Sequence, residues 1–143
     1  MPPAGPDDHR RGEGPELIVY ADLGCPYCAN AWAEISAREA TIVFRHFPVA
    51  SKHPRAPVLH AAAEAAGLQG HFFEMVDSLY EDRGHVDDPH LWQRVEDLGL
   101  DLERFEQDRR SNATATRIRR DFESGIRAGV TATPTVFPGR AAT

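Results

Sequence analysis

The sequence predicts a single mixed α/β domain, and three observations support this prediction. A β-rich apolar run at 16–21, a helical segment that begins near Pro26 and a second β-rich run at 41–47 form a strand–helix–strand unit with parallel strands. Helical periodicity then extends over about 54–129, and β-rich sequence returns at 130–137. The length of 143 residues corresponds to about one domain.

The N-terminal part of the sequence predicts an arm, a strand and the start of a helix. Residues 1–15 are rich in proline, glycine and charge, so we expect a flexible arm before a domain that spans 16–143. The apolar run at 16–21 favours a strand that is buried on both faces. Pro26 suits the first helical position, which needs no backbone N–H, and this places Cys25 at the N-cap.

The rest of the sequence predicts a helical block between two strands. The run at 41–47 is β-rich and ends at Pro48. Asp88 is the expected N-cap of the third helix of the block. We expect these helices at 54–67, 71–84, 88–99, from about 101 onward and at 111–128, most of them ended by a glycine. In the last run, at 130–137, Pro134 interrupts the β-rich sequence.

Composition and charge exclude several classes of partner. The formal net charge is −6, so we expect no extended basic surface for nucleic acid. The arginines between positions 109 and 120 are interleaved with acidic residues and predict a solvated helix face. No run reaches the roughly 18 apolar residues of a membrane span. The charged N-terminus lacks the apolar segment of a secretory signal. We therefore predict a cytoplasmic protein with no membrane span and no nucleic-acid partner.

The stretch DLGCPYCANAW, at 22–32, contains both cysteines of the chain and is the main candidate for chemistry. At helical spacing the Cα atoms of Cys25 and Cys28 lie about 5 Å apart, within the roughly 4.4–6.8 Å that a disulfide spans. The N-cap position favours the thiolate form of Cys25, because backbone N–H groups and the helix dipole are directed toward it. We expect Cys25 to be the exposed attacking thiol and Cys28 the more buried resolving thiol.

Two other interpretations of the cysteine pair stay open at this point. A structural zinc site usually needs four nitrogen or sulfur ligands, so His46, His53 or another histidine would have to complete it. Alternatively, both cysteines are inert buried residues. We favour a redox pair, because Pro26 and the strand–turn–helix context would otherwise be coincidental, and we predict no metal and no cofactor. His46, near the end of the second strand, is expected to be structural.

Several short motifs extend this interpretation beyond the cysteines. They are C-P-Y-C at a helix start, F-R-H-F-P, A-A-E-A-A, F-F-E-M, D-L-E-R-F and G-V-T-A-T-P-T. Together they resemble the DsbA-like thioredoxin-fold oxidoreductases, in particular their short cytosolic branch. The resemblance covers about 9–138, and the combination of C-P-Y-C with T-P-T is its most specific part.

The resemblance implies a fold, an activity and a set of site residues. The fold would be thioredoxin-like, with the helical block at about 54–129 inserted between the second strand and the proline-containing strand. Cys25 matches the nucleophilic cysteine and Cys28 the resolving one. Pro134 matches a cis-proline beside the pair, and Thr133 matches the residue whose backbone pairs with an extended substrate. The implied function is disulfide exchange with protein or peptide thiols.

The sequence departs from the family pattern around the cysteines. Val19 occupies the position of a buried acid that many members carry, and Asp22 is the nearest acid, so we expect proton transfer at Cys28 to pass through water or to be slow. Tyr27 gives C-P-Y-C, typical of glutaredoxins, in place of C-P-H-C. This implies a potential nearer to about −200 to −230 mV than to about −120 mV. Pro26 and Tyr27 have supporting roles, and Tyr27 also shapes the contact surface.

The family pattern continues after the last strand with a further strand and a closing helix, whereas PGRAAT follows Phe137 here. The strand that contains Pro134 would then lie at the edge of the sheet. This predicts either a lower stability than that of full-length members or a homodimer. Two alternative functions stay open. One is a non-catalytic thioredoxin-like binding or regulatory module, and the other is a glutathione-linked, glutaredoxin-like reductase.

Overall fold

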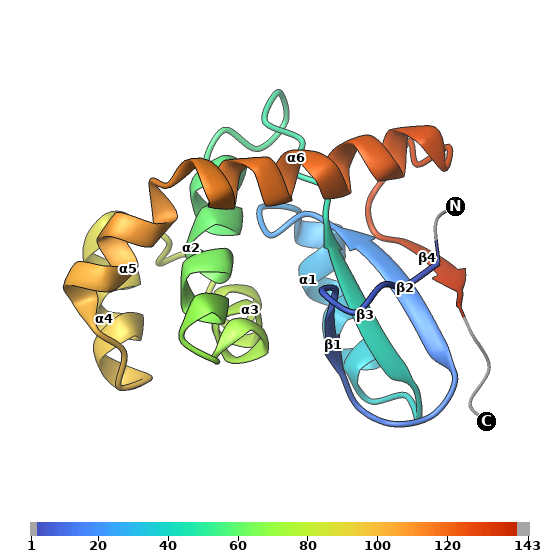
Figure 1. Cartoon of the computed structure of the whole chain (residues 1–143), viewed down its shortest axis with the longest axis horizontal. Helices are drawn as coiled ribbons and strands as arrows, with labels where there is room; N and C mark the ends of the chain where they lie inside the picture. The colour runs from blue at the N-terminus through green and yellow to red at the C-terminus, as the bar shows by residue number, and fades with distance from the viewer. Residues whose placement is uncertain (1–2, 140–143) are drawn as a thin grey trace.

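The structure is a computed structural model that describes residues 3–139 (Figure 1). These residues form four strands and six helices. In chain order the elements are β1 (His9–Arg11), β2 (Glu16–Ala21), α1 (Pro26–Ser36), β3 (Thr41–His46), α2 (Ala56–Leu68), α3 (Phe72–Glu81), α4 (Asp88–Asp97), α5 (Leu102–Arg109), α6 (Asn112–Arg127) and β4 (Thr135–Pro138). The mixed α/β class is confirmed, with the helical block inserted between β3 and β4.

The four strands form one sheet in the order β1–β3–β2–β4. The central strands β2 and β3 are parallel, with Val19 opposite Phe44 and Ala21 opposite His46. β1 pairs antiparallel with β3, and β4 pairs antiparallel with β2. Because parallel strands end at the same edge of a sheet, the loops that follow Ala21 and His46 lie together. This edge positions the candidate site.

Alternating side chains of β2 and β3 build two apolar cores. Val19 and Phe44 face the larger core, which they form with α1, α2 and α3. Ile18 and Tyr20 face the smaller core, which is closed by α6. Figure 1 shows the sheet at one end of the molecule, α4 and α5 at the other end, and α6 running along both parts. Helices therefore cover both faces of the central strands, as their continuous apolar runs predict.

The last helix begins and ends at local signals in the sequence. Ser111 is the N-cap of α6, and its side chain accepts a hydrogen bond from the backbone N–H of Thr114. Gly129, with a φ of +86°, follows the end of the same helix. Inside α6, Gly125 permits close packing, because a Cβ there would lie 2.7 Å from the ring of Phe47. None of the described helices is long and apolar enough to cross a membrane.

The prediction of a flexible arm over 1–15 is wrong for the part next to the domain. His9–Arg11 forms β1 and pairs with β3. The buried carboxylate of Asp8 accepts two hydrogen bonds from the guanidinium of Arg45, and Ala4 is buried. The polar sequence HRR has little strand propensity of its own. Pairing with β3 and the ion pair therefore fix this segment, and neither is visible in the local sequence.

Three helix boundaries also differ from the prediction, and one of them is the end of α3, which lies at Glu81 and not at Gly84. α2 continues through Gly67, where a Cβ would lie 3.2 Å from Cβ of Phe72, and the left-handed conformation is taken by Gly70 instead. The N-cap of α4 is Asp87 and not Asp88. The proline that follows is tolerated at either position, because the N–H groups of the first helical turn have no helical partner.

The position of β4 tests the prediction that the last strand lies at the edge of the sheet. β4 lies at one edge of the described sheet, directly after Pro134, as the sequence predicts. Residues 140–143, which belong to the PGRAAT segment, lie outside the described residues. The predictions of lower stability or of a homodimer stay predictions.

Candidate active site

Cys25 and Cys28 lie at the N-terminal end of α1, directly after the loop that leaves β2. Cys25 is the N-cap, with extended backbone angles of φ −87° and ψ 123°, and Pro26 occupies the first helical turn, as predicted. The two cysteines are 3.7 Å apart and both are free thiols. A disulfide between them therefore needs little movement of the backbone.

Cys25 differs from the prediction in its exposure and its contacts. Its exposed fraction is 4%, so the residue is buried and not exposed. Its side chain makes no capping hydrogen bond within the described residues. The thiol instead faces the backbone carbonyl oxygen of Thr133, with 3.8 Å between sulfur and oxygen. The segment that leads into β4 therefore packs against Cys25, and this contact between residues far apart in the sequence explains the lower exposure.

Thr133 and Pro134 form the second half of the site. The peptide bond between them is cis, as the family resemblance implies. Both residues are half-buried. Tyr27, between the two cysteines, is 75% exposed. The site thus combines a buried thiol pair, a length of backbone that precedes an edge strand, and an exposed aromatic ring.

Cys28 lies deeper in the fold than its partner. Its exposed fraction is 2%, and burial raises the pKa of its thiol to about 12. The backbone N–H of Asp22 donates to its sulfur at 3.5 Å. Val19, at the position where family members carry a buried acid, is fully buried in the core. Cys28 is therefore a protonated thiol at neutral pH, and Val19 offers no group that could take the proton.

Asp22 holds the loop between β2 and α1. Its carboxylate is fully buried and accepts hydrogen bonds from the backbone N–H groups of Gly24 and Val49, both at 2.9 Å. Burial alone would raise the pKa of Asp22, but its contact with His60 and these backbone hydrogen bonds lower it. The carboxylate is therefore ionised, and it is engaged with the backbone of two loops.

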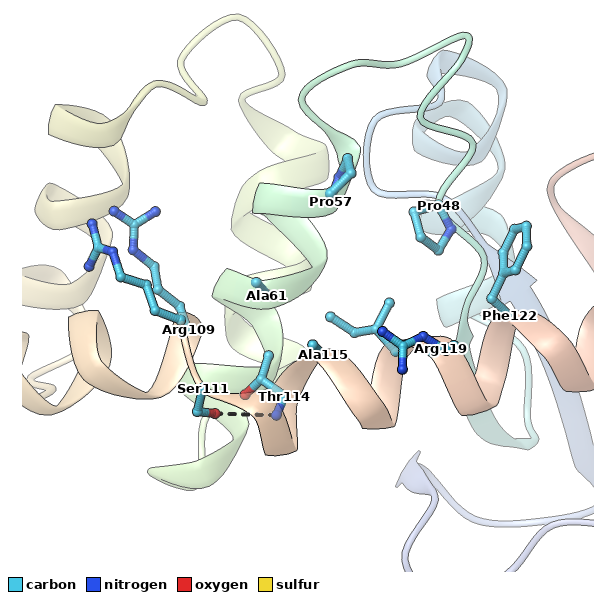
Figure 2. Close-up of a pocket in the computed structure, with 11 residues that line it drawn as sticks. Pro48, Pro57, Ala61, Arg109, Ser111, Thr114, Ala115, Arg119 and Phe122 are labelled. Carbon is cyan, nitrogen blue, oxygen red and sulfur yellow. Dashed lines mark hydrogen bonds between the residues drawn. The ribbon is translucent and has the colours of Figure 1, made fainter.

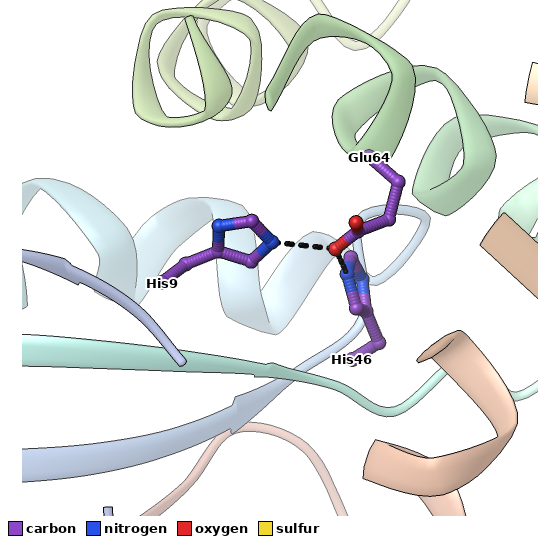
Figure 3. A group of neighbouring side chains, drawn as sticks. All are labelled: His9, His46 and Glu64. Carbon is purple, nitrogen blue, oxygen red and sulfur yellow. Dashed lines mark hydrogen bonds and ion pairs between the residues drawn. The ribbon is translucent and has the colours of Figure 1, made fainter. Parts of the chain in front are cut away.

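A buried cluster that the sequence did not reveal lies behind the cysteine loop (Figure 3). We name His9, His46 and Glu64 the histidine–glutamate cluster. Oε1 of Glu64 lies 2.5 Å from Nε2 of His9 and 2.7 Å from Nε2 of His46. Nδ1 of His46 lies 2.7 Å from Nδ1 of His60, and Nε2 of His60 lies 3.0 Å from the backbone N of Leu23. One further histidine therefore links the cluster to the cysteine loop.

Burial and hydrogen bonding set the protonation states in and beside this cluster. Burial lowers the pKa of His46 to about 4 and also lowers that of His60. Burial alone would raise the pKa of Glu64, but hydrogen bonds from His46 and His9 lower it. At neutral pH the cluster therefore contains an ionised carboxylate beside a neutral imidazole at His46.

Part of the cluster has a signal in the sequence. His60 and Glu64 are four positions apart, which places them on one face of α2, and Glu64 is the charged residue in an otherwise alanine-rich stretch. No local pattern brings His9 and His46 to the same place. Their meeting depends on the pairing of β1 with β3, and β1 was not predicted.

A hollow of about 360 Å³ lies beside the cysteine loop. It is lined by Leu23 and Gly24 of that loop and by three cationic side chains, those of Lys52, Arg55 and Arg83. A carboxylate-bearing ligand placed here would therefore meet positive charge beside Leu23 and Gly24 of the cysteine loop.

A second hollow, of about 350 Å³, lies between α2 and α6 (Figure 2). Pro48, Ala61 and Phe122 contribute apolar surface, and Arg109 and Arg119 lie among its other lining residues. Neither the cysteine pair nor the cis-proline segment lines it. This hollow is therefore separate from the thiol chemistry.

Comparison with protein families gives one match over most of the chain. Residues 13–140 match the family described as thioredoxin.

Comparison with curated proteins finds relatives that are much longer. The chain is 38% identical over 148 residues to the Na(+)/H(+) antiporter NhaA of Herminiimonas arsenicoxydans, a match that covers 95% of this chain and 23% of that protein. It is 40% identical to the Na(+)/H(+) antiporter NhaA 1 of Salinispora arenicola, with 96% and 22% covered. The chain thus spans less than a quarter of the length of these relatives.

Comparison with solved structures finds the same fold. A thioredoxin-like oxidoreductase from Silicibacter pomeroyi superimposes with a TM-score of 0.78 at 21% identity, covering 96% of this chain and 86% of that one. A variant of alpha-DsbA1 from Wolbachia pipientis gives 0.79 at 22%, with 94% and 75% covered. BdbD from Bacillus subtilis gives 0.74 at 14%, with 96% and 84% covered. At these identities the likeness establishes the fold.

Proposed function

The chain belongs to the thioredoxin family, and on this premise we propose that it is a DsbA-like thiol–disulfide oxidoreductase that exchanges disulfides with protein or peptide thiols. The observation that carries the proposal is the meeting of Cys25 with the cis Thr133–Pro134 segment, where 3.8 Å separates the Cys25 sulfur from the Thr133 carbonyl oxygen. An extended substrate that pairs with the Thr133 backbone would bring its own sulfur to Cys25.

The proposed reaction has two exchange steps. In the first, the Cys25 thiolate attacks a substrate disulfide, forms a mixed disulfide and releases one substrate thiolate, which takes up a proton. In the second, the Cys28 sulfur loses its proton and attacks Cys25, which forms the Cys25–Cys28 disulfide and releases the second substrate thiol. The substrate gains two electrons and two protons, and the cysteine pair loses them. The reverse sequence oxidises a dithiol substrate.

Deprotonation of Cys28 controls the second step in this scheme. Burial raises the pKa of this thiol to about 12, and Val19 supplies no acid to accept the proton. We therefore infer that the proton leaves through water or leaves slowly, which are the two alternatives that the sequence predicts. Tyr27 in place of a histidine favours a reduction potential of about −200 to −230 mV, and a potential above about −150 mV, measured in glutathione buffers, would contradict this.

The test of the proposal is insulin reduction with dithiothreitol as the electron donor. We expect turnover by the parent protein and none above background for Cys25→Ser. In a parallel reaction without dithiothreitol, which would cleave the product, we expect Cys28→Ser to form a trapped mixed disulfide with insulin, seen as a mass shift on a gel without reductant. Far-UV circular dichroism of both variants provides the control for folding. The proposal fails if the parent protein is no faster than a folded Cys25→Ser variant.

A glutathione-linked reductase is the alternative within the same chemistry. The hollow beside the cysteine loop supports it, because Lys52 and Arg83 would face the carboxylates of glutathione, while Arg55 is paired with Asp88. Reduction of a glutathionylated peptide that depends strictly on glutathione would favour this alternative. A Lys52→Ala/Arg83→Ala variant should then show a higher KM for glutathione and unchanged insulin reduction.

A non-catalytic binding or regulatory module is the second candidate, and the curated relatives favour it. They are named as Na(+)/H(+) antiporters, and this chain matches less than a quarter of their length. In this role the thioredoxin-like domain would hold a partner through Pro134 and its helical face. The insulin assay separates the two functions, because a module of this kind would show no turnover that depends on Cys25.

Two further predictions concern location and assembly. We propose a cytoplasmic location, where the surrounding thiols would keep the cysteine pair reduced. We also propose that the edge of β4 can pair with another strand, either of a substrate or of a second copy. Light scattering tests whether a second copy binds to this edge. A monomer at micromolar concentration would indicate that the edge pairs with a substrate strand and not with a second copy.

A further inference from the structure

We propose that the histidine–glutamate cluster binds a divalent transition-metal ion, with zinc as the expected occupant. Three side chains from β1, β3 and α2 direct one ligand atom each to a common point (Figure 3). These atoms are Nε2 of His9, Nε2 of His46 and Oε1 of Glu64, and all lie within 4.8 Å of one another. Two imidazoles and one carboxylate form a ligand set that zinc accepts at sites with an open fourth position.

The spacing of the ligand atoms is close to that of a metal site. Bonds of about 2.0–2.1 Å to a tetrahedral ion hold the ligand atoms about 3.3 Å apart. Oε1 of Glu64 now lies 2.5 Å from the nitrogen of His9 and 2.7 Å from that of His46. The carboxylate oxygen therefore has to withdraw by less than about 1 Å from each nitrogen to admit the ion. Rotation about the side-chain bonds of Glu64 achieves this, and the two histidine nitrogens, which lie within 4.8 Å of each other, have to approach the same spacing.

The second ring nitrogen of His46 has the partner that a metal-bound histidine needs. With the ion at Nε2, the proton of His46 lies on Nδ1 and is donated to Nδ1 of His60, 2.7 Å away. Nε2 of His60 faces the backbone N of Leu23 at 3.0 Å and Oδ1 of Asp22 at 3.4 Å. His60 can therefore accept from Leu23 without the ion and donate to Asp22 with it. In the ion-bound state the Leu23 N–H loses this acceptor, so binding of the ion costs one buried hydrogen bond.

His9 gives the cluster its access to solvent. Its side chain is 17% exposed, whereas those of His46 and Glu64 are 0% and 6% exposed. The His9 ring is stacked on that of Phe72 with 3.6 Å between centroids, which fixes its direction. A hollow of about 380 Å³ opens at this side chain. An ion can enter here, and a water molecule can complete its coordination.

The same contacts would also serve a purely structural network, in which each imidazole donates to the carboxylate. The contrast with an exposed pair on the same protein shows what the cluster adds. His71 and Glu74 lie 2.7 Å apart at the surface and line the same hollow as His9, but among residues 3–139 they belong to no group of three close ligand atoms. His71 therefore provides a matched control for non-specific binding of zinc to a histidine–carboxylate pair.

The experiment uses the full chain with Cys25→Ser/Cys28→Ser, because the free thiols would compete for zinc. The protein is treated with a chelator, dialysed and titrated with Zn²⁺ by calorimetry, and with Co²⁺ by visible absorption. We expect one Zn²⁺ per chain, ligand-field bands of Co²⁺ coordinated by nitrogen and oxygen, and a rise in Tm with Zn²⁺ that Mg²⁺ does not produce.

Substitutions assign the binding to this cluster. We expect His9→Gln and Glu64→Gln each to weaken Zn²⁺ binding at least tenfold and to remove the rise in Tm, while His71→Gln leaves both unchanged. His9 lies on a short edge strand, so its variant should fold even if the Glu64 variant does not, and circular dichroism checks this. The proposal is overturned if the double serine variant binds no Zn²⁺ saturably, or if a folded His9→Gln variant binds as the parent does.

Discussion

Cys28 and Glu64 are two buried acids on the same side of the sheet, and burial has opposite outcomes for them. Cys28 is 2% exposed, and burial raises the pKa of its thiol to about 12. Glu64 is 5% exposed, yet its pKa is lowered. The difference lies in the partners of the anionic form. Two imidazole nitrogens face the carboxylate of Glu64, whereas the sulfur of Cys28 meets the backbone N–H of Asp22 at 3.5 Å and the side chain of Thr133, which do not outweigh its burial.

The same fold keeps the buried Cys28 thiol protonated and the buried Glu64 carboxylate ionised. Burial disfavours a charged form by removing water, and only hydrogen bonds or opposite charge can restore it. At the cysteine pair the hydrogen bonds to the resolving thiol are weaker than the effect of burial, so this thiol is neutral until a base removes its proton. At the histidine–glutamate cluster two strands, β1 and β3, supply the hydrogen bonds that support the carboxylate.

The largest expected effect concerns the reactivity of Cys28. In a Cys25→Ser variant, alkylation of native Cys28 by iodoacetamide should be about a thousandfold slower at neutral pH than that of an unperturbed thiol. The reason is that the pKa is raised from 9.0 to about 12, which lowers the thiolate fraction by that factor. The rate should rise about tenfold per pH unit up to the limit of folding, because the thiolate is the reacting form. Mass spectrometry of quenched samples measures it.

The control for this measurement is the same variant unfolded in urea, where Cys28 should react like a free thiol. A plateau of the native rate near pH 9 would show that the sulfur has more hydrogen-bond support than the Asp22 N–H provides. The contrast between Cys28 and Glu64 would then disappear.

The next effect concerns the stability that the cluster provides. Glu64→Ala removes the acceptor for His9 and for the fully buried His46, and we expect it to lower the free energy of unfolding by about 3 kcal/mol. Glu64→Gln keeps a carbonyl oxygen at the same place and should cost less. Urea unfolding in the presence of a chelator measures both, so that bound metal does not contribute.

Glu123→Ala, at an exposed position in α6, is the matched control and should change the stability by less than about 0.5 kcal/mol. If Glu64→Ala has an effect as small as that, the carboxylate makes no net contribution to stability. In that case the cost of burying the charge offsets its two hydrogen bonds.

The same contrast separates what the sequence can predict from what it cannot. Cys25 and Cys28 belong to one helical turn, so their spacing, the N-cap and Pro26 are local signals. The central strand at 16–21 is likewise predicted with its observed limits, because a continuous apolar run needs no information from elsewhere in the chain.

The features that the sequence analysis missed depend on contacts between distant segments. β1 is a polar tripeptide that is a strand only because it pairs with β3. His9 meets Glu64 because of that pairing. Cys25 is buried because Thr133, at the far end of the chain, lies against it. For each of these, the sequence supplies the residues, but tertiary packing decides where they lie.

The smallest of these effects concerns Asp22, which lies between the cysteine pair and the histidine–glutamate cluster. Asp22→Asn replaces one acceptor oxygen by an N–H₂ group that faces a backbone N–H, and we expect it to lower the free energy of unfolding by about 2 kcal/mol at pH 7. Because the pKa of Asp22 is lowered in the folded protein, its contribution is present above the ordinary aspartate pKa and is lost as the pH falls through the folded value. The difference between parent and variant should therefore be constant from pH 7 to 5 and should shrink below about pH 4. Urea unfolding at each pH measures it, with the exposed Asp97→Asn as the control.

The pH dependence of disulfide exchange then decides whether Asp22 also handles the proton of Cys28. The Asp22 carboxylate accepts from the N–H groups of Gly24 and Val49, and it is the backbone N–H of Asp22 that meets the sulfur. We therefore expect Asp22→Asn to leave the shape of the pH–rate profile of insulin reduction unchanged while it lowers stability. A profile that loses a titration step in the variant would instead make Asp22 the substitute for the acid that Val19 replaces. Cys28 would then have a proton acceptor, although its anionic form would still lack the hydrogen-bond partners that Glu64 has.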